Sequence, residues 1–308
     1  MIPERTVVVA EIGINHNGDP ALAEQLIVAA ARAGADAVKL QKREPELAVP
    51  PEQWQVPRET PWGTMPYIEY KRRMELDLAT LVQLQRVAKR CGIELFFSVW
   101  DMPSLQLVSK HFGPAYMKVP SAKLTDHGLV AAAAEWCGKA GSQLVLSTGM
   151  STAEEIVDAV QVAYTGLHLG LDQGGQRDPL PLWVLHCHSA YPAPTAELNL
   201  QHVQTLAQQL VPESPSTVPI VVGYSGHEFG VSPTVWAVVL GARMVERHIT
   251  LDRTMWGTDQ LASVEPLAFE RMVRQIRSAE QALGDGVKVV WPSELPALQK
   301  LRGAPADG

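Results

Sequence analysis

The sequence predicts a closed (β/α)8 barrel, that is, an eight-stranded parallel TIM barrel. Short apolar segments alternate with longer segments that are apolar on a 3.6-residue period, and eight of the short segments occur. Unbroken apolar strands are typical of strands covered on both faces, which favours a closed parallel barrel over an open sheet. The 308-residue length is close to the roughly 250 residues of such a barrel with extensions. We assign residues 1–284 to one barrel domain and 285–308 to a short C-terminal extension.

The eight strand candidates are rich in apolar and β-branched residues. They lie at residues 6–13, 36–41, 93–100, 115–120, 143–149, 182–188, 219–225 and 243–249. Intervening segments such as 20–34 and 77–92 end in glycine, as helices commonly do. A last helix is expected at 265–283.

Two segments interrupt the alternation. Residues 42–74 form a Pro-rich, Trp-bearing insertion that is too long for a plain connector. We expect it to fold over the mouth of the barrel, and a packing excursion or an oligomer contact is the alternative. Residues 168–181 are expected to be an ordinary surface connection after a helix.

Composition excludes several classes of protein. Lys plus Arg is 26 and Asp plus Glu is 33, a net charge of −7 without a long basic run, so nucleic acid is not an expected partner. The sequence has no signal-peptide pattern and no apolar run of about 20 residues, which predicts a cytoplasmic protein without a membrane partner. Cys91, Cys137 and Cys187 have no CxxC spacing and are expected to be free thiols that serve packing.

Polar residues close most of the predicted strands, and in such barrels chemistry occurs at the carboxyl ends of the strands. A single lysine at a strand end is more often solvated or ion-paired than a ligand. Two lysines on different strands with nearby hydroxyls suit a phosphate and a carboxylate on one small molecule. The strand-end residues are Glu11, Lys39, Gln41, Lys118, Ser121, Ser147, His186, His188, Ser189, Ser225, His227, Glu246 and His248.

Two of these histidines could hold a metal ion. His227 and His248 close adjacent strands, 21 residues apart, so both imidazoles could face one point above the barrel. With water and a carboxylate they suit an open divalent site, for which Mn²⁺ is expected and Mg²⁺ or Co²⁺ is possible. The alternative is one metal ligand and one hydrogen-bonded structural histidine.

Seven motifs in order carry a resemblance to a known family. They read AEIGINHNGD, DAVKLQ, MKVPSAKLTD, LSTGMST, LHCHSAYPAP, GYSGHEFG and GARMVERHITLDRTMWGTDQ. From about residue 6 to 284 the chain resembles the catalytic barrel of the sialic acid synthase family, the N-acetylneuraminate synthases and their relatives. The resemblance implies condensation of phosphoenolpyruvate with an open-chain aldose, N-acetylmannosamine or a related hexose. The products would be a 2-keto-3-deoxy acid of the sialic or nonulosonic type and phosphate, and the enzyme would be a homodimer.

The resemblance also implies roles for individual residues. His227 and His248 would bind Mn²⁺, which polarises the aldehyde, and Glu11 would hold a metal-bound water or transfer a proton, unless it is a capping or salt-bridge carboxylate. Glu246 matches a motif carboxylate, although it could be an interior ion pair. Phosphoenolpyruvate would contact Lys39, Lys118, Ser121, Ser147, Ser189 and Ser225, and the acceptor would contact Gln41, Tyr191 and Asp259.

The chain departs from the family pattern at several positions. Lys123 stands where an acidic residue is usual, and Glu228 follows His227 where the family commonly has threonine. We hypothesise that Lys123 and Glu228 form an ion pair that reshapes the acceptor pocket. Ser189 replaces a usual asparagine, and Trp256 replaces a proline, where it could be a sugar platform or a packed aromatic.

The larger departure concerns the C-terminal region. Many members of the family have an antifreeze-like domain after the barrel, and we expect no such domain in this sequence. Acceptor recognition is therefore expected from barrel loops such as 42–74, or from a separate polypeptide. Two other functions stay open. A Schiff-base aldolase could use Lys39 or Lys118 but would leave the paired histidines without a role, and a sugar-phosphate-binding barrel could lack turnover.

Overall fold

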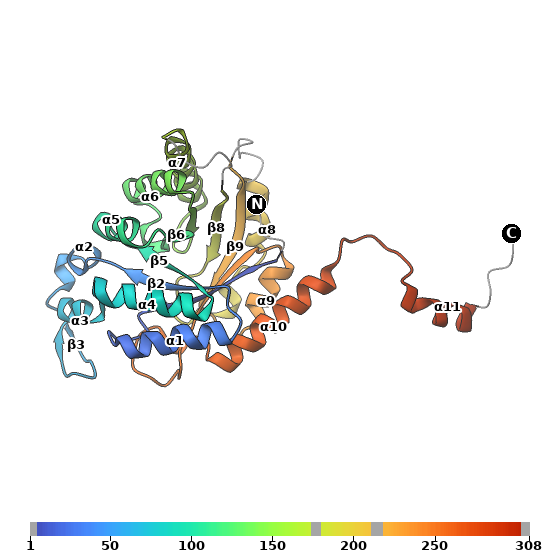
Figure 1. Cartoon of the computed structure of the whole chain (residues 1–308), viewed down its shortest axis with the longest axis horizontal. Helices are drawn as coiled ribbons and strands as arrows, with labels where there is room; N and C mark the ends of the chain where they lie inside the picture. The colour runs from blue at the N-terminus through green and yellow to red at the C-terminus, as the bar shows by residue number, and fades with distance from the viewer. Residues whose placement is uncertain (1–4, 174–179, 211–217, 303–308) are drawn as a thin grey trace.

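The computed structural model describes residues 5–173, 180–210 and 218–302, and its strands close into a parallel barrel (Figure 1). Every neighbouring pair of barrel strands is parallel, and the last strand pairs with the first. All eight predicted strands and the fold class are thereby confirmed. In order around the barrel they are β1 (Val7–Gly13), β2 (Ala37–Lys42), β5 (Glu94–Val99), β6 (Tyr116–Val119), β7 (Gln143–Ser147), β8 (Leu182–Cys187), β9 (Ile220–Gly226) and β10 (Met244–His248).

Helices surround the barrel, and several begin at an aspartate whose side chain caps a backbone N–H, as Asp77 and Asp126 do. Gly92 ends one helix in the left-handed conformation that its sequence predicts. The predicted connection at 168–181 is partly wrong, because the preceding helix continues to Asp172, and residues 174–179 lie outside the described residues. The helices are α1 (Pro20–Arg32), α4 (Leu78–Cys91), α5 (Met102–His111), α6 (His127–Ala140), α7 (Ala153–Asp172), α8 (His202–Leu210), α9 (Ser232–Val239) and α10 (Pro266–Leu283).

The hydrophobic core has two parts. The larger part lies between the strands and the surrounding helices, and a smaller cluster that includes Val9, Phe96 and Trp183 fills the barrel interior. Alternate residues of each strand face inward, so the interior of a barrel is filled in layers. The apolar layers end below the carboxyl ends of the strands, where polar side chains replace them.

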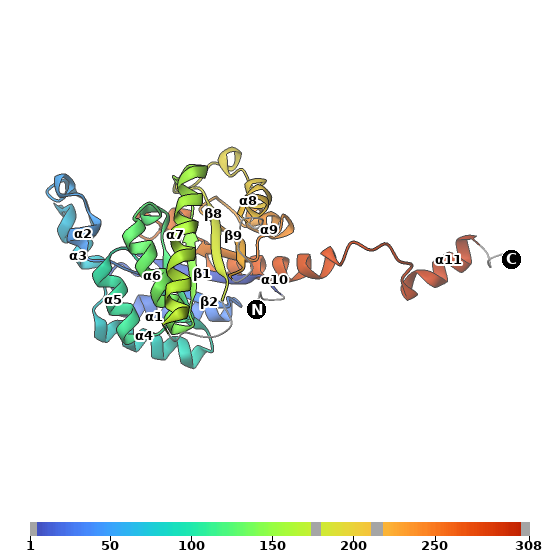
Figure 2. The same ribbon diagram turned by 90° about the horizontal axis from the view of Figure 1, so that it is seen from above.

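The insertion at 42–74 has secondary structure of its own. It contains α2 (Pro45–Ala48), β3 (Pro57–Arg58), β4 (Met65–Pro66) and α3 (Tyr67–Met74), which lie together to one side of the barrel beside the end of β2 (Figure 2). Tyr70 and Met74 pack with Ile14 and Trp256, which follow β1 and β10. Trp256 is therefore a packed aromatic, with its ring centroid 5.4 Å from that of Tyr70 in an edge contact.

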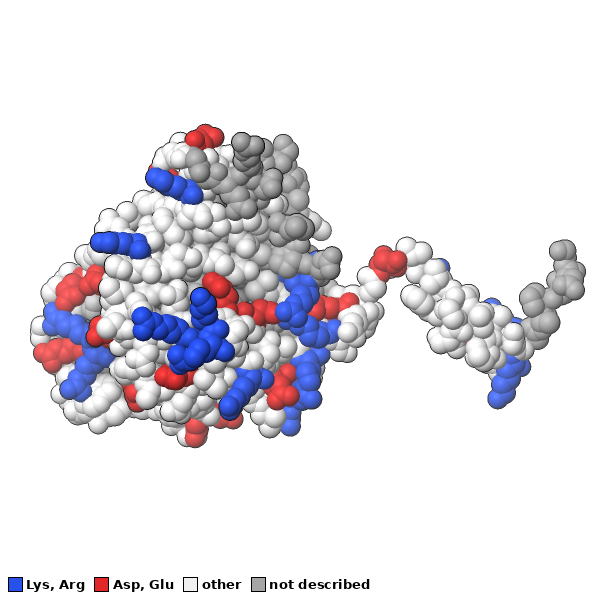
Figure 3. Space-filling model, in the orientation of Figure 1, with Lys and Arg blue, Asp and Glu red and all other residues white. Residues whose placement is uncertain are grey.

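After α10, residues 285–302 lead away from the barrel and include α11 (Leu295–Arg302), as both ribbon views show. On the face shown in Figure 3, basic and acidic side chains lie interspersed over the barrel. None of the helices within the described ranges has the length and apolar character needed to cross a bilayer.

Candidate active site

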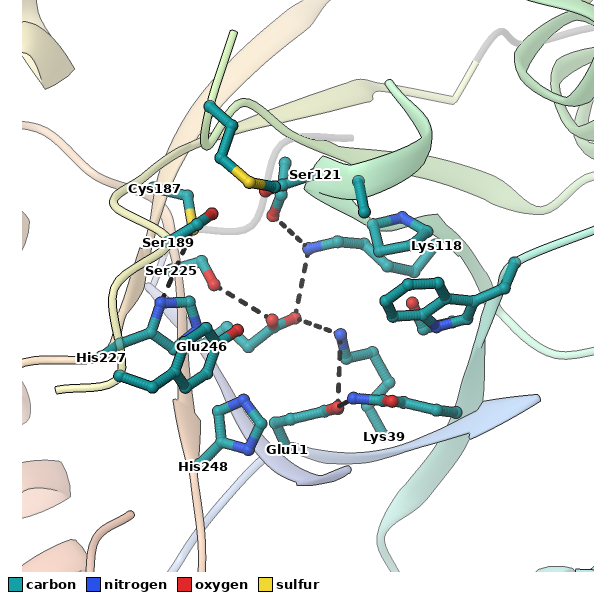
Figure 4. Close-up of a pocket in the computed structure, with 18 residues that line it drawn as sticks. Glu11, Lys39, Lys118, Ser121, Cys187, Ser189, Ser225, His227, Glu246 and His248 are labelled. Carbon is teal, nitrogen blue, oxygen red and sulfur yellow. Dashed lines mark hydrogen bonds and ion pairs between the residues drawn. The ribbon is translucent and has the colours of Figure 1, made fainter. Parts of the chain in front are cut away.

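A cavity of about 270 Å³ opens at the carboxyl ends of the barrel strands. Most of the site residues predicted from the sequence line it, and Figure 4 shows how their side chains converge. Lys123, Glu228 and Asp259 are not among its lining residues. The predicted residues that line the cavity are Glu11, Lys39, Gln41, Lys118, Ser121, Ser147, Ser189, Tyr191, Ser225, His227, Glu246 and His248.

Strand register brings these side chains together. On β10, Met244 faces the barrel interior, so the alternation directs Glu246 and then His248 to the same side, nearer the mouth. On β1, Glu11 stands directly beside His248 of β10 and beside Lys39 of β2. Residues far apart in the chain thus become neighbours because the barrel is closed.

Glu246 lies at the centre of the site and contacts two lysines (Figure 4). Its Oε2 lies 3.1 Å from Lys39 Nζ and 3.3 Å from Lys118 Nζ, and its Oε1 accepts a 3.1 Å hydrogen bond from Ser225. Lys39 Nζ also lies 3.3 Å from Glu11 Oε2, and Lys118 donates to Ser147 Oγ at 2.6 Å. The two ammonium groups are therefore balanced by two carboxylates, and the interior ion pair considered for Glu246 is present.

Burial and neighbouring charges shift the pKa values of these groups. Burial, together with the charge of Lys39, lowers the pKa of Lys118 to about 8, although Glu246 opposes the shift. Burial disfavours the Lys39 ammonium too, but Glu11 and Glu246 outweigh it and raise the pKa of Lys39. Burial would raise the pKa of Glu246, but the two lysines lower it well below its usual value. Burial raises the pKa of Glu11, against the opposing effect of Lys39.

The pKa of Lys118 gives a testable pH dependence. The cationic form that attracts an anion is present below pH 8. Affinity for phosphoenolpyruvate, the substrate that the sequence resemblance implies, should therefore fall as the pH rises through 8, at most roughly tenfold per pH unit for one group. Glu246, Lys39, Cys187 and Glu11 also act on Lys118. Ionisation of the Cys187 thiol or of Glu11, whose pKa is raised, would add a similar trend. Calorimetric titration of phosphoenolpyruvate between pH 6.5 and 9.5 would measure the dependence.

The same titration of Lys118→Met should show no such fall, and Cys187→Ala should retain it. A wild-type affinity that does not change across this range, or an unchanged fall in Lys118→Met, would contradict the assignment of the titration to Lys118.

The two histidines face each other beside this network. Their ring centroids are 5.4 Å apart, and the ring of Tyr191 lies 4.0 Å from that of His227. His227 Nδ1 donates a 2.7 Å hydrogen bond to the carbonyl of His188, which leaves the lone pair of Nε2 for another ligand. Burial lowers the pKa of His248 to about 4, so its imidazole is neutral.

These residues fit a divalent metal. His248 Nδ1 is buried without a hydrogen-bond partner among the described residues, and the nearest Asp259 carboxylate oxygen is 3.8 Å away. A side-chain carbon at Gly13 would lie 3.1 Å from that nitrogen and 3.2 Å from Glu11 Oε1, so glycine keeps the space between them open. Neutral imidazole and carboxylate are suitable ligands for Mn²⁺. Among the described residues no three His, Cys, Asp or Glu side chains are arranged as a metal cluster, so the fit rests on the paired histidines, with Glu11 beside His248 in the strand register.

The sequence analysis missed several residues of the cavity wall, chiefly Ser98, Trp100, Met150 and Cys187. Strand alternation from the interior residue Phe96 could have found Ser98 and Trp100. The three cysteines are free as expected, but Cys187 is not simply a packing residue. Burial would raise its pKa, yet the adjacent His227 outweighs that effect and lowers it.

The predicted Lys123–Glu228 ion pair is wrong. Glu228 is fully buried, and its Oε1 lies 2.9 Å from Arg247 Nη1, whose charge satisfies it inside the protein. Lys123 Nζ instead lies 3.9 Å from Asp126 in the next turn. Arg247 alternates with Glu246 and His248 along β10, so its side chain points away from the barrel interior. Glu228 pairs with it on that side, away from the cavity.

The two histidines at the carboxyl end of β8, His186 within it and His188 just after it, have local partners. His186 is buried with its Nε2 2.7 Å from the carbonyl of Leu198, and His188 Nε2 lies 3.1 Å from Glu197. Both contacts stabilise the segment after β8, on which Ser189 and Tyr191 reach the cavity.

Comparison with known proteins gives this site its context. The model of the NeuB family matches residues 26–288, which is most of the chain. The chain belongs to the NeuB family. N,N'-diacetyllegionaminic acid synthase of Campylobacter jejuni is 34% identical over 301 residues, covering 97% of this chain and 84% of the relative. Human N-acetylneuraminate-9-phosphate synthase is 34% identical over 299 residues, covering 96% of this chain and 76% of the relative.

A solved structure agrees with these relatives. The N-acetylneuraminic acid synthetase of Leptospira borgpetersenii superposes with a TM-score of 0.76 at 26% identity, covering 97% of this chain and 92% of that one. The resemblance carried by the seven sequence motifs is thereby confirmed. This NeuB family member is an enzyme, a phosphoenolpyruvate-dependent synthase of the kind that the family comprises.

Proposed function

We propose that this enzyme condenses phosphoenolpyruvate with the open-chain aldehyde of a hexose derivative, giving a nonulosonic acid and phosphate. The observation that carries the proposal is the placement of Lys39 and Lys118 on one carboxylate, Glu246, in a cavity that the paired histidines also line. Relatives named for legionaminic, pseudaminic and N-acetylneuraminic 9-phosphate synthesis support the product class.

The cavity has the groups needed to hold a small dianion. Lys39 and Lys118 supply positive charge, and hydroxyls of Ser121, Ser147 and Ser225 supply donors at the ends of β6, β7 and β9. The backbone N–H of Gly149 donates to Ser121 Oγ at 3.0 Å. When phosphoenolpyruvate binds, the lysine ammoniums can exchange part of their contact with Glu246 for the phosphate and carboxylate of the substrate.

The chemistry then balances as follows. The π electrons of phosphoenolpyruvate form the bond from C3 to the aldehyde carbon, and the aldehyde oxygen takes up a proton. Water adds to the cationic C2 and loses one proton, which balances the proton taken up by the aldehyde oxygen. The C2 hydroxyl then loses its proton as the C2–O bond to phosphate breaks, which leaves the 2-keto acid and protonated phosphate. Glu11 lies beside the histidines, where it can hold a water or move a proton, and Lys39 and Lys118 balance the charge of the departing phosphate.

His227 and His248 would hold the divalent metal, for which we propose Mn²⁺, and Glu11 would hold a water or transfer a proton beside it. When bound, the metal would supply Lewis-acid polarisation of the aldehyde oxygen. Gln41 donates to Glu11 Oε1 at 2.8 Å, and Asp259 lies beside His248, so both can orient the carboxylate and imidazole as well as contact acceptor hydroxyls.

Phosphate release across a panel of aldoses tests the proposal. With phosphoenolpyruvate and Mn²⁺, the panel would include mannose, N-acetylmannosamine, diacetamido hexoses and arabinose 5-phosphate. We expect release to depend on one class of acceptor, to fall to background with chelator and to return with Mn²⁺. Calorimetry should show Mn²⁺ binding to the wild type that is at least roughly tenfold weaker in His248→Ala.

Two outcomes would favour the alternatives. Borohydride trapping of pyruvate on Lys39 or Lys118, with activity that survives chelation, would indicate a Schiff-base aldolase. Phosphoenolpyruvate binding without phosphate release from any acceptor would indicate a binding protein. A homodimer, a cytoplasmic location and a separate polypeptide that assists acceptor binding stay predictions.

A further inference from the structure

A group of cations and aromatic rings in the insertion lies outside the catalytic cavity. Arg58 Cζ is 5.5 Å from the ring centroid of Tyr67 and 5.2 Å from that of Tyr70. Lys71 Nζ is 5.2 Å and 5.5 Å from the same two rings. The two rings are themselves stacked, with centroids 6.0 Å apart. Arg58 of β3 and Lys71 of α3 are both half-buried. Their charged groups lie against the same pair of aromatic side chains.

This group has donors without acceptors. Over the ranges that the structure describes, no carboxylate lies within 4.0 Å of the charged nitrogens of Arg58 or Lys71. Tyr70 is 1% exposed, and its hydroxyl has no hydrogen-bond partner among the described residues. The buried Nε of Arg58 also has no hydrogen-bond partner there. Buried polar groups are nearly always satisfied, so these donors fit an absent acceptor.

The charges around Lys71 agree with this view. Burial lowers the pKa of Lys71 to about 8, and the charges of Arg43 and Arg58 act in the same direction. Asp259 and Glu75 oppose the shift, and neither forms an ion pair with Lys71. An anion bound among these cations would offset their repulsion and favour the charged lysine.

The group adjoins the catalytic cavity on two sides. Tyr70 packs on Trp256, three residues before Asp259, whose carboxylate lies 3.8 Å from His248. On the other side, Arg43 Nη2 donates to Gln41 Oε1, and the Arg43 guanidinium lies 4.9 Å from the ring of Trp100.

Both Gln41 and Trp100 line the cavity. Arg58, Lys71 and Tyr70 do not themselves line the cavity, so an aldose with its carbonyl carbon at the histidines would have to extend past Gln41 and Trp100 to place its far end among them.

We propose that Arg58, Lys71 and Tyr70 bind an anionic group, a phosphate or a carboxylate, at the far end of the aldose acceptor. The inference rests on the proposed function and specifies its substrate class as an acidic sugar. A neutral hydroxyl could accept one hydrogen bond from Tyr70, but it would not neutralise two half-buried cations. A phosphate or carboxylate satisfies the donors and the charge together.

Three acceptors matched in their carbon skeleton test the inference. They are 2-acetamido-2-deoxymannose, its 6-phosphate and the corresponding acid with a carboxylate at C6. We expect kcat/KM to be at least roughly tenfold higher for one of the two anionic acceptors than for the neutral sugar, because each charge-assisted hydrogen bond contributes more than a neutral one. Phosphate release from phosphoenolpyruvate measures all three.

Variants identify the residues involved. Lys71→Met and Arg58→Met should each lower kcat/KM for the anionic acceptor roughly 10- to 100-fold, with little change for the neutral sugar or in KM for phosphoenolpyruvate. Tyr70→Phe should lower it less. Arg72→Met is the matched control, since Arg72 is exposed on the same helix and pairs with Glu46, so it should behave as the wild type. Equal kcat/KM for neutral and anionic sugars, or equal losses for both in the variants, would overturn the inference.

Calorimetry separates failure of this inference from failure of the proposed function. If no acceptor supports phosphate release, the proposed function fails, but binding still decides whether the anion subsite exists. The sugar 6-phosphate or the sugar acid should bind the wild type more tightly than the neutral sugar, and Lys71→Met should remove the difference. If inorganic phosphate alone binds as tightly as the sugar phosphate and Lys71→Met weakens both, the site takes free phosphate and the acceptor assignment is wrong.

Discussion

Replacing Lys118 by methionine is expected to lower kcat/KM for phosphoenolpyruvate by roughly 10²- to 10⁴-fold, through loss of about two charge-assisted hydrogen bonds at ~1.5–3 kcal/mol each. Methionine keeps much of the length of lysine, so the change removes the ammonium with little loss of volume. Among the residues that the structure describes, Glu246 then retains only Lys39 as an ion-pair partner, and Ser147 loses its donor. Steady-state phosphate release with saturating acceptor measures the effect.

Lys139→Met is the matched control. Lys139 is exposed on α6, the helix that follows the strand carrying Lys118, and its replacement should leave kcat/KM and the unfolding midpoint unchanged. Retention of near-wild-type kcat/KM by a folded Lys118→Met enzyme would refute a role for Lys118 in substrate binding.

Replacing Glu228 by glutamine is expected to destabilise the fold by about 3–5 kcal/mol, because it leaves the charge of Arg247 buried without its partner. Arg247 is 1% exposed, and Tyr224 and Thr234 donate to the same carboxylate at 2.9 Å each. For a chain of this size the loss corresponds to a melting temperature lower by on the order of 10 °C. Urea unfolding at pH 7 measures the free energy of unfolding.

The partner variant and the double variant complete a thermodynamic cycle. Arg247→Met alone should destabilise to a similar degree, since it leaves Glu228 unpaired. The double variant Glu228→Gln/Arg247→Met should be clearly more stable than the sum of the single effects predicts. Simple additivity would mean that the two side chains do not interact. Lys123→Ala, by contrast, should add independently to Glu228→Gln.

Sequence alone determined the barrel and most of the cavity wall. Apolar strand segments that alternate with helical segments, several of them ended by glycine, specify the architecture because both faces of each strand are buried. In a closed parallel barrel all strand ends meet at one mouth, so Glu11, Lys39, Lys118, Glu246 and His248 could be placed together before any coordinates were known. The family motifs fall at these same strand ends for this reason.

Tertiary structure alone decided which charges pair. The sequence placed Lys123 and Glu228 near the mouth, but it gave no measure of the competing cation Arg247, which faces the helices and takes Glu228 into the core. Ion pairing depends on distance and burial, and both are set by packing between segments far apart in the chain.

The same holds for the insertion. Its length and proline content predicted a loop folded over the mouth, and Arg58, Lys71 and Tyr70 contact one another within it. Only its meeting with Trp256, which Tyr70 contacts, sets this group beside the segment after β10. No short-range pattern encodes that meeting, because residues almost 200 positions apart create it by burying their aromatic rings against each other.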